Sequence, residues 1–136
     1  MKDRRRFLQA GFASVGLIAL GSAEVGTEFG IKTIYQRDLP AVSLDGWQVT
    51  ALELTYPPGL ASPKHLHPGF VLGYVLGGEF RLCMEGEPEG TLSSGEMFYE
   101  APGKIHMPSR SASASKPARI LALAFSQKGK EITKLL

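Results

Sequence analysis

The chain has 136 residues, of which 43% are hydrophobic and 21% charged, with a formal net charge of +2 and a pI near 8.8. A chain of this length forms one domain with a small core. No basic patch alternates with aromatic residues, which argues against nucleic acid as a partner. The single cysteine, Cys83, cannot form a disulfide within the chain, so packing must stabilise the fold.

Residues 1–23 have the composition of an export signal. The arginines Arg4–Arg6 precede an apolar segment of 14 residues, Phe7–Leu20, and small residues follow it. This segment is shorter than the roughly 20 residues that span a bilayer, so we expect no permanent membrane span. The string DRRRFLQ resembles a twin-arginine signal, which implies cleavage near Ala23 and an exported, periplasmic or extracellular protein. Residues 24–136 keep 11 basic and 12 acidic residues, so their net charge is −1.

The remaining chain contains short strand-like runs and no long helical pattern. We expect residues 24–46 to form an N-terminal arm with a short strand around Ile31–Tyr35. Within residues 47–126, the runs rich in β-branched and aromatic residues are Trp47–Tyr56, Phe70–Leu76, Glu79–Met84, Glu96–Glu100 and Ala118–Ser126. Such spacing is typical of an all-β sandwich or barrel. Residues 127–136 are expected to be a tail with at most a turn or two of helix.

The Gly77-Gly78 pair predicts a two-residue hairpin that joins Phe70–Leu76 to Glu79–Met84. Because side chains alternate along a strand, one face carries His65, His67, Val71, Gly73 and Val75. The opposite face carries Phe70, Leu72, Tyr74 and Leu76. Since both faces are apolar, the outer one needs cover from the arm or from a second subunit, and we expect a homodimer.

All three histidines fall at two places in the chain. His65 and His67 are separated by one residue, so a strand would place both imidazoles on one side, and His106 follows the turn APG. Imidazole is a common ligand of borderline transition metals. Two packed or exposed histidines would show the same spacing, so the pair by itself does not establish a metal site.

The two histidine segments resemble the two motifs of the cupin superfamily, in particular its small single-domain, type-2 barrels. The matching residues are Gly59, His65, His67 and Gly78 in the first motif, and Gly95, Ala101-Pro102-Gly103 and His106 in the second. The resemblance spans about residues 47–125. It implies a single jelly-roll β-barrel in which His65, His67 and His106 bind one divalent metal, with Fe²⁺ favoured and Mn²⁺, Ni²⁺ or Zn²⁺ as alternatives.

Two positions depart from the motifs. Val71 stands where cupins often have a glutamate, and Arg110 and Ser111 stand where they often have an asparagine. Three neutral imidazoles would leave the metal at its full +2 charge, which favours anionic or enolic ligands. Glu100, just before the APG turn, is the candidate general base or partner of an imidazole, although a surface glutamate at a strand end is the simpler interpretation.

The resemblance therefore implies an exported, mononuclear metal-binding cupin that takes a small-molecule ligand or substrate. One hypothesis is an oxidoreductase of dioxygenase type that acts on a small anionic or enolic oxygenated compound. Isomerases, lyases and non-catalytic ligand-binding modules share this fold, so the fold does not decide the reaction. A structural Zn²⁺ site would need a fourth protein ligand, and the sequence does not show one.

Overall fold

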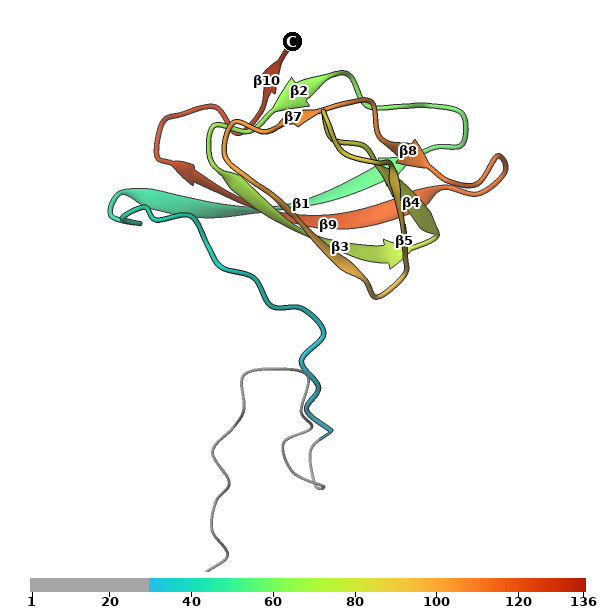
Figure 1. The fold of residues 1–136 in the computed structure, drawn as a ribbon, viewed down its shortest axis with the longest axis horizontal. Helices are drawn as coiled ribbons and strands as arrows, with labels where there is room; N and C mark the ends of the chain where they lie inside the picture. The colour runs from blue at the N-terminus through green and yellow to red at the C-terminus, as the bar shows by residue number, and fades with distance from the viewer. Residues whose placement is uncertain (1–29) are drawn as a thin grey trace, which may run out of the picture. The chain divides into compact units, whose positions relative to one another are not determined.

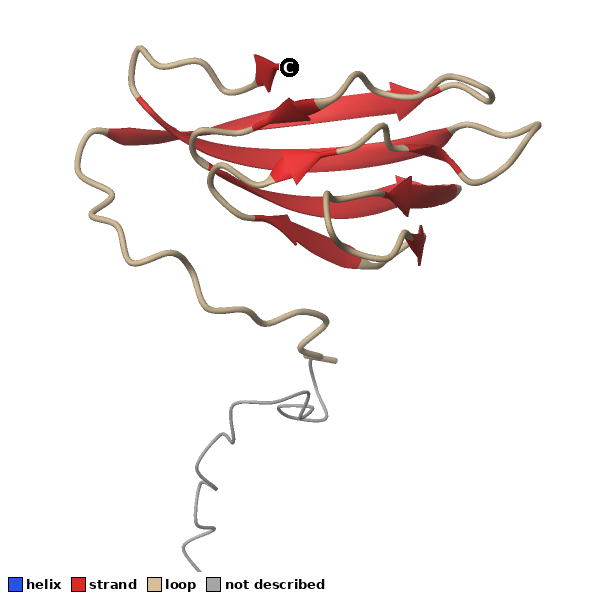
Figure 2. Ribbon diagram, turned by 45° about the horizontal axis from the view of Figure 1, so that its top comes forward, coloured by secondary structure: helices blue, strands red, loops and turns tan. Residues whose placement is uncertain are grey.

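The computed structural model describes residues 30–136, and the export signal expected at residues 1–23 lies outside them. Residues 34–136 form a single unit. Its regular structure consists of β-strands arranged in three antiparallel sheets (Figures 1 and 2). None of the described residues form a helix long and apolar enough to cross a membrane.

The largest sheet has the strand order β1-β9-β3-β6. Its strands are β1 (Trp47–Tyr56), β9 (Ala118–Gln127), β3 (Phe70–Gly77) and β6 (Met97–Glu100). β1 and β9 pair along their full ten residues, from Trp47 opposite Gln127 to Tyr56 opposite Ala118. β3 is central, because it pairs with β9 on one side and with β6 on the other.

Two smaller sheets complete the barrel. One has the order β10-β2-β7, formed by β10 (Lys134–Leu135), β2 (His65–Leu66) and β7 (Ile105–His106). The other has the order β5-β4-β8, formed by β5 (Gly90–Ser93), β4 (Glu79–Leu82) and β8 (Arg110–Ser111). In Figure 1 the strands β2, β7 and β10 lie across from the long strands β1 and β9. The expected all-β barrel of short antiparallel strands is confirmed.

The core lies between the large sheet and the two smaller ones. Val75 of β3 and Ile120 of β9 pack with Phe80 of β4 and Phe98 of β6, and all four side chains are buried. Gly73 makes this packing tight, because a Cβ atom there would overlap the Phe98 ring. The inward placement of Val71 and Val75 follows from strand alternation alone, and the structure confirms it.

The hairpin predicted at Gly77-Gly78 is wrong. β3 pairs with β9 and β6, whereas β4 pairs with β5 and β8, so the two strands belong to different sheets. The chain bends at Gly78, where φ is +73° and a Cβ atom would overlap the Pro117 carbonyl oxygen. The glycine is needed for a corner between sheets, and a hairpin turn would use the same residue type.

Three further expectations differ from the structure. Ile31–Tyr35 form no strand among the described residues, and the C-terminal tail forms the strand β10 in place of a helical turn. Phe70 does not belong to the half-exposed outer stripe of β3, because it is buried and its ring stacks on Phe125 at 4.6 Å. Leu72, Tyr74 and Leu76 remain half-buried on that face.

Candidate metal centre

Three short strand ends bring the candidate residues together. His65 lies on β2, His67 follows it directly, His106 lies on β7, and Glu100 ends β6. β2 and β7 are antiparallel neighbours, with His65 opposite His106. The two motif segments, about 40 residues apart in the sequence, therefore meet through a short backbone ladder.

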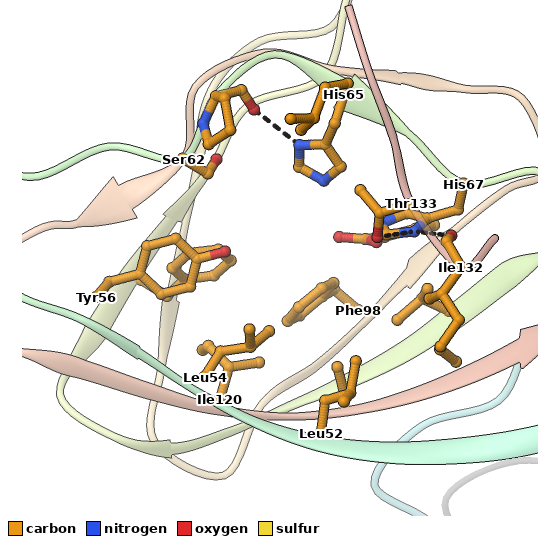
Figure 3. A pocket seen from close by; sticks show the side chains of 17 residues that line it. Leu52, Leu54, Tyr56, Ser62, His65, His67, Phe98, Ile120, Ile132 and Thr133 are labelled. Atoms are coloured by element: carbon orange, nitrogen blue, oxygen red, sulfur yellow. Dashed lines mark hydrogen bonds and ion pairs between the residues drawn. The ribbon is translucent and has the colours of Figure 1, made fainter.

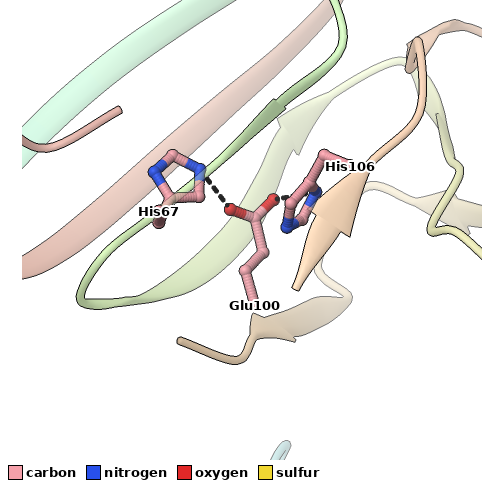
Figure 4. Close-up of side chains that lie close together, drawn as sticks. All are labelled: His67, Glu100 and His106. Atoms are coloured by element: carbon pink, nitrogen blue, oxygen red, sulfur yellow. Dashed lines mark ion pairs between the residues drawn. The ribbon is translucent and has the colours of Figure 1, made fainter. Parts of the chain in front are cut away.

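Glu100 bridges two of the histidines (Figure 4). Its Oε2 lies 2.9 Å from His67 Nε2, and its Oε1 lies 3.3 Å from His106 Nδ1. Glu100 is only 8% exposed and His106 only 1% exposed. The three residues offer ligand atoms that all lie within 4.8 Å of one another, the spacing of groups that could hold one metal ion. The interpretation of Glu100 as a surface glutamate is therefore wrong.

Backbone carbonyls fix two of the imidazoles. His67 Nδ1 donates to the Ile132 carbonyl oxygen at 2.8 Å, and His65 Nδ1 donates to the Pro63 carbonyl oxygen at 2.8 Å. A carbonyl oxygen only accepts, so the proton sits on Nδ1 and the Nε2 lone pair remains free in the neutral ring. Metal-binding histidines are commonly oriented by such an outer hydrogen bond.

The electrostatics of His67 and His106 differ. Burial by itself would lower the pKa of His67, but the hydrogen bond and charge of Glu100, with the Ile132 carbonyl, outweigh it and raise this pKa above its ordinary value of 6.5. Burial lowers the pKa of His106 below 6.5, and the Glu100 charge offsets this only in part. Glu100 thus stabilises the protonated form of His67, which must lose that proton to bind a metal, while the lowered pKa of His106 favours the neutral form that binds metals.

The donor set fits a divalent transition metal. His106 Nε2 is a buried ring nitrogen with no hydrogen-bond partner among the described residues. Buried polar atoms are usually satisfied, so this nitrogen is available to a ligand. Two or three imidazoles with one carboxylate suit Fe²⁺, Mn²⁺, Ni²⁺ or Zn²⁺ better than the all-oxygen sets preferred by Mg²⁺ or Ca²⁺.

His65 stands beside this group without joining its closest contacts. Its ring centroid lies 5.0 Å from that of His67 and 5.0 Å from that of His106, on which it stacks at 19°. The structure therefore brings all three histidine rings to one place, and the donor atoms of His67, His106 and Glu100 lie within 4.8 Å of one another. Glu79, at the start of β4, is exposed and lies outside this group.

The sequence did not predict that Glu100 is buried in the site, because the motif places the carboxylate at position 71 on β3 and the pairing of β3 with β6 is not visible in the sequence. Val71, at the position where cupins often have a glutamate, is the register partner of Glu100 across β3 and β6. Partners in adjacent strands point to the same face with Cβ atoms about 5 Å apart. The carboxylate thus enters the barrel from the strand beside the usual one. The pairing of β3 with β6 was the missing signal.

A pocket opens beside the cluster (Figure 3). It has a volume of about 200 Å³ and includes His65, His67 and Glu100 in its wall. The rest of the wall is mainly apolar side chains of β1, β3, β9 and the C-terminal segment. A small molecule that enters this pocket would meet the histidines directly.

Comparison with solved structures supports the fold. The chain is 28% identical to the DMSP lyase DddQ from Ruegeria pomeroyi DSS-3, with a TM-score of 0.56 over 64% of this chain and 42% of that one. It is 19% identical to a cupin-like protein from Thermotoga maritima, with a TM-score of 0.53 over 77% and 89% of the two chains. It is 16% identical to oxalate decarboxylase from Bacillus subtilis, with a TM-score of 0.54 over 65% and 24%.

This chain thus spans less than half the length of the DMSP lyase and about a quarter of the decarboxylase. No match is found among curated protein sequences. The Cupin domain model matches residues 52–124, which contain both histidine segments, Glu100 and most of the barrel. The chain therefore belongs to the cupin family.

Proposed function

We propose that this cupin binds one divalent transition metal through His67, His106 and Glu100, with His65 as a further ligand. The observation that supports this most strongly is the buried Glu100 carboxylate between two imidazoles, beside the unpartnered His106 Nε2. Because Glu100 carries a charge, the bound site would have a net charge near +1. This differs from the +2 expected for three neutral histidines.

In this proposal the chain's own residues orient the ligands and shape the site. The Ile132 carbonyl holds the His67 ring so that Nε2 faces the cluster, and the Pro63 carbonyl does the same for His65. The apolar wall of the pocket limits the access of water to the remaining positions. A bound divalent ion would polarise an oxygen donor of the substrate, and Fe²⁺ would also supply electrons to O₂.

Elemental analysis of the purified protein tests the metal site. We expect about one metal per chain in the native protein, and a loss of affinity by orders of magnitude in His67→Ala, His106→Ala and Glu100→Gln. His65→Ala should lose less, because His65 lies outside the closest group. Lys64→Ala is the matched control, since Lys64 pairs with Glu85 outside the cluster. Undiminished metal in a folded variant would remove that residue from the site.

For the reaction, we propose dioxygenase-type chemistry on a small anionic or enolic oxygenated compound. A metal-dependent lyase is the second candidate, favoured by the 28% identity to the DMSP lyase, and isomerases or a non-catalytic ligand-binding module share the fold. The Fe²⁺-loaded protein should consume O₂ with β-diketones or catechols. Turnover that continues at the same rate without O₂ would favour the lyase, and tight binding without turnover would favour the non-catalytic module.

We also propose a homodimer through the half-buried side chains of Leu72, Tyr74 and Leu76 on β3. Arg37 of the arm lies over the Tyr99 ring at 4.6 Å, so the arm already covers part of the same sheet face. Leu72→Glu should shift the mass measured by light scattering from dimer to monomer. A native protein that is monomeric at micromolar concentration would contradict the dimer.

Export to the periplasm is likewise a proposal, and it rests on the arginine and apolar content of residues 1–23. Fractionation of cells that express the full chain should place a shortened protein outside the cytoplasm. Replacement of Arg4–Arg6 by lysine should retain the protein inside. A full-length cytoplasmic product from the native chain would contradict export.

A further inference from the structure

The pocket beside the metal cluster is polar at one end and apolar at the other. His65 and His67 stand at one end, while Leu52, Leu54 and Phe98 stand toward the other (Figure 3). The remaining apolar residues of its wall are Pro63, Val71, Phe80, Ile120, Ala122, Ala124, Ile132 and Leu135. The polar end can bind an oxygen donor, and the apolar end can bind only a group without charge.

Among the described residues, the pocket wall contains an acidic side chain and no lysine or arginine to balance it. This acidic residue is Glu100. A ligand whose second carboxylate lies away from the metal, among the apolar residues, would bury that negative charge without a cationic partner, which is strongly unfavourable. Besides Glu100 and the two histidines, the polar groups of the wall are three neutral hydroxyls, those of Tyr56, Ser62 and Thr133, and the last lies beside His67.

The pocket is large enough for a ring. Its volume is about 200 Å³, and an apolar protein cavity of roughly 150 Å³ accommodates benzene. Two apolar residues of the wall are exposed at different ends of the pocket: Leu54, 39% exposed, at the apolar end, and Leu135, 66% exposed, opposite His65. A ligand that enters past Leu54 would therefore cross apolar side chains before its polar group reaches the histidines.

We infer that the substrate of this cupin is a small molecule with one oxygen-donor head and an apolar, ring-sized body, and that it is not a dicarboxylate. The head binds at the metal site and the body fills the space between Leu52, Leu54 and Phe98. The inference rests on the proposed metal site and narrows its substrate class. The dicarboxylates excluded are those whose second carboxylate lies away from the metal.

Three probes test the inference on the metal-loaded full chain by isothermal titration calorimetry. Acetohydroxamate and benzohydroxamate carry the same metal-binding head without and with a ring, and fumarate is a small dianion whose two carboxylates point apart and cannot bind one ion together. Each affinity is divided by the affinity of that probe for the same ion in solution, so the ratio reports the pocket. Burial of about 100 Å² of ring surface should make the ratio for benzohydroxamate roughly 30- to 100-fold larger than that for acetohydroxamate. Fumarate should give the smallest ratio.

Two matched variants on β1 add a cation inside or outside the pocket. Leu54→Arg places a guanidinium in the pocket wall, and it should lower the benzohydroxamate ratio at least about tenfold and raise that of fumarate by a similar factor. Val49→Arg is the control, because Val49 lies on the opposite face of β1 and is 56% exposed. It should leave both ratios unchanged.

The metal content of the same samples separates the two ways to fail. Protein that binds metal but gives equal ratios for the two hydroxamates, or the largest ratio for fumarate, would overturn the substrate inference alone. Protein that binds no metal would overturn the proposed function, and the inference with it. The ratios of the three probes on the native protein test the substrate inference even if Leu54→Arg does not fold.

Discussion

The position of the carboxylate gives the sharpest test of the proposed centre. Glu100 and Val71 are register partners, so their side chains enter the barrel from adjacent strands on the same face. Glu100→Gln keeps the shape of the side chain and removes its charge. Loss of even an outer partner of a metal ligand costs about 10- to 100-fold in metal affinity, and loss of Glu100, proposed here as a ligand itself and 2.9 and 3.3 Å from two imidazoles, should cost at least the upper figure. We therefore expect a loss of at least ~100-fold, or ~2.8 kcal/mol.

The exchange of the two partners should reverse this loss. In the double variant Val71→Glu/Glu100→Val, the carboxylate reaches the same space from β3, and metal affinity should return to within about tenfold of the native value. Val71→Glu alone should destabilise the metal-free fold, because it buries two carboxylates side by side. Competition with a fluorescent zinc chelator measures the affinities, and circular dichroism checks the fold.

Two results would refute the reasoning. Unchanged affinity in folded Glu100→Gln would show that the carboxylate is not part of the site. A folded double variant that remains as weak as Glu100→Gln would show that position 71 cannot replace position 100. Glu79→Gln is the control, since Glu79 is exposed and lies outside the cluster.

Two further predictions concern titration and packing. In the metal-free protein, NMR titration of the imidazoles should give a pKa above 6.5 for His67 and a pKa below 6.5 for His106. Glu100→Gln should lower the pKa of His67. His67 then contributes stability below pH 6.5 that is lost as the pH rises through its raised pKa, whereas the lowered pKa of His106 costs stability as the pH falls below 6.5; equal titration of both rings would contradict these shifts. Gly73→Ala should lower the free energy of unfolding by about 1–3 kcal/mol in urea denaturation, because the new methyl group overlaps the Phe98 ring, and an unchanged midpoint would contradict the tight packing.

The strands with strong local signals were predictable from the sequence. The two ten-residue strands alternate clearly or contain dense runs of β-branched and aromatic residues, and the structure places them at Trp47–Tyr56 and Ala118–Gln127, within a residue of the prediction. Among the shorter strands, Glu79–Leu82 and Met97–Glu100 were also predicted, whereas others were missed. Gly90–Ser93 and Lys134–Leu135 have little intrinsic β-propensity, and their pairing with β4 and β2 holds them in place.

The pairing of strands could not be read from local sequence. Gly77-Gly78 has the composition of a hairpin turn, but the neighbours of β3 come from residues 97–100 and 118–127. The role of Glu100 could not be predicted for the same reason, because it depends on the pairing that places Glu100 opposite Val71. The histidines were identifiable because their residue type carries the chemistry wherever the chain places them, whereas a glutamate is common on surfaces.

The pairing of β1 with β9 also determines when this chain can fold. Their partners lie about 60 to 80 residues apart in the sequence, and β3 too depends on β9 for one of its neighbours. At a synthesis rate of roughly 5–20 residues per second, β1 leaves the ribosome several seconds before its partner exists. The large sheet must therefore assemble after translation has passed Gln127. Fragments that end before Ala118 would leave both β1 and β3 with unpaired edges and a tendency to aggregate.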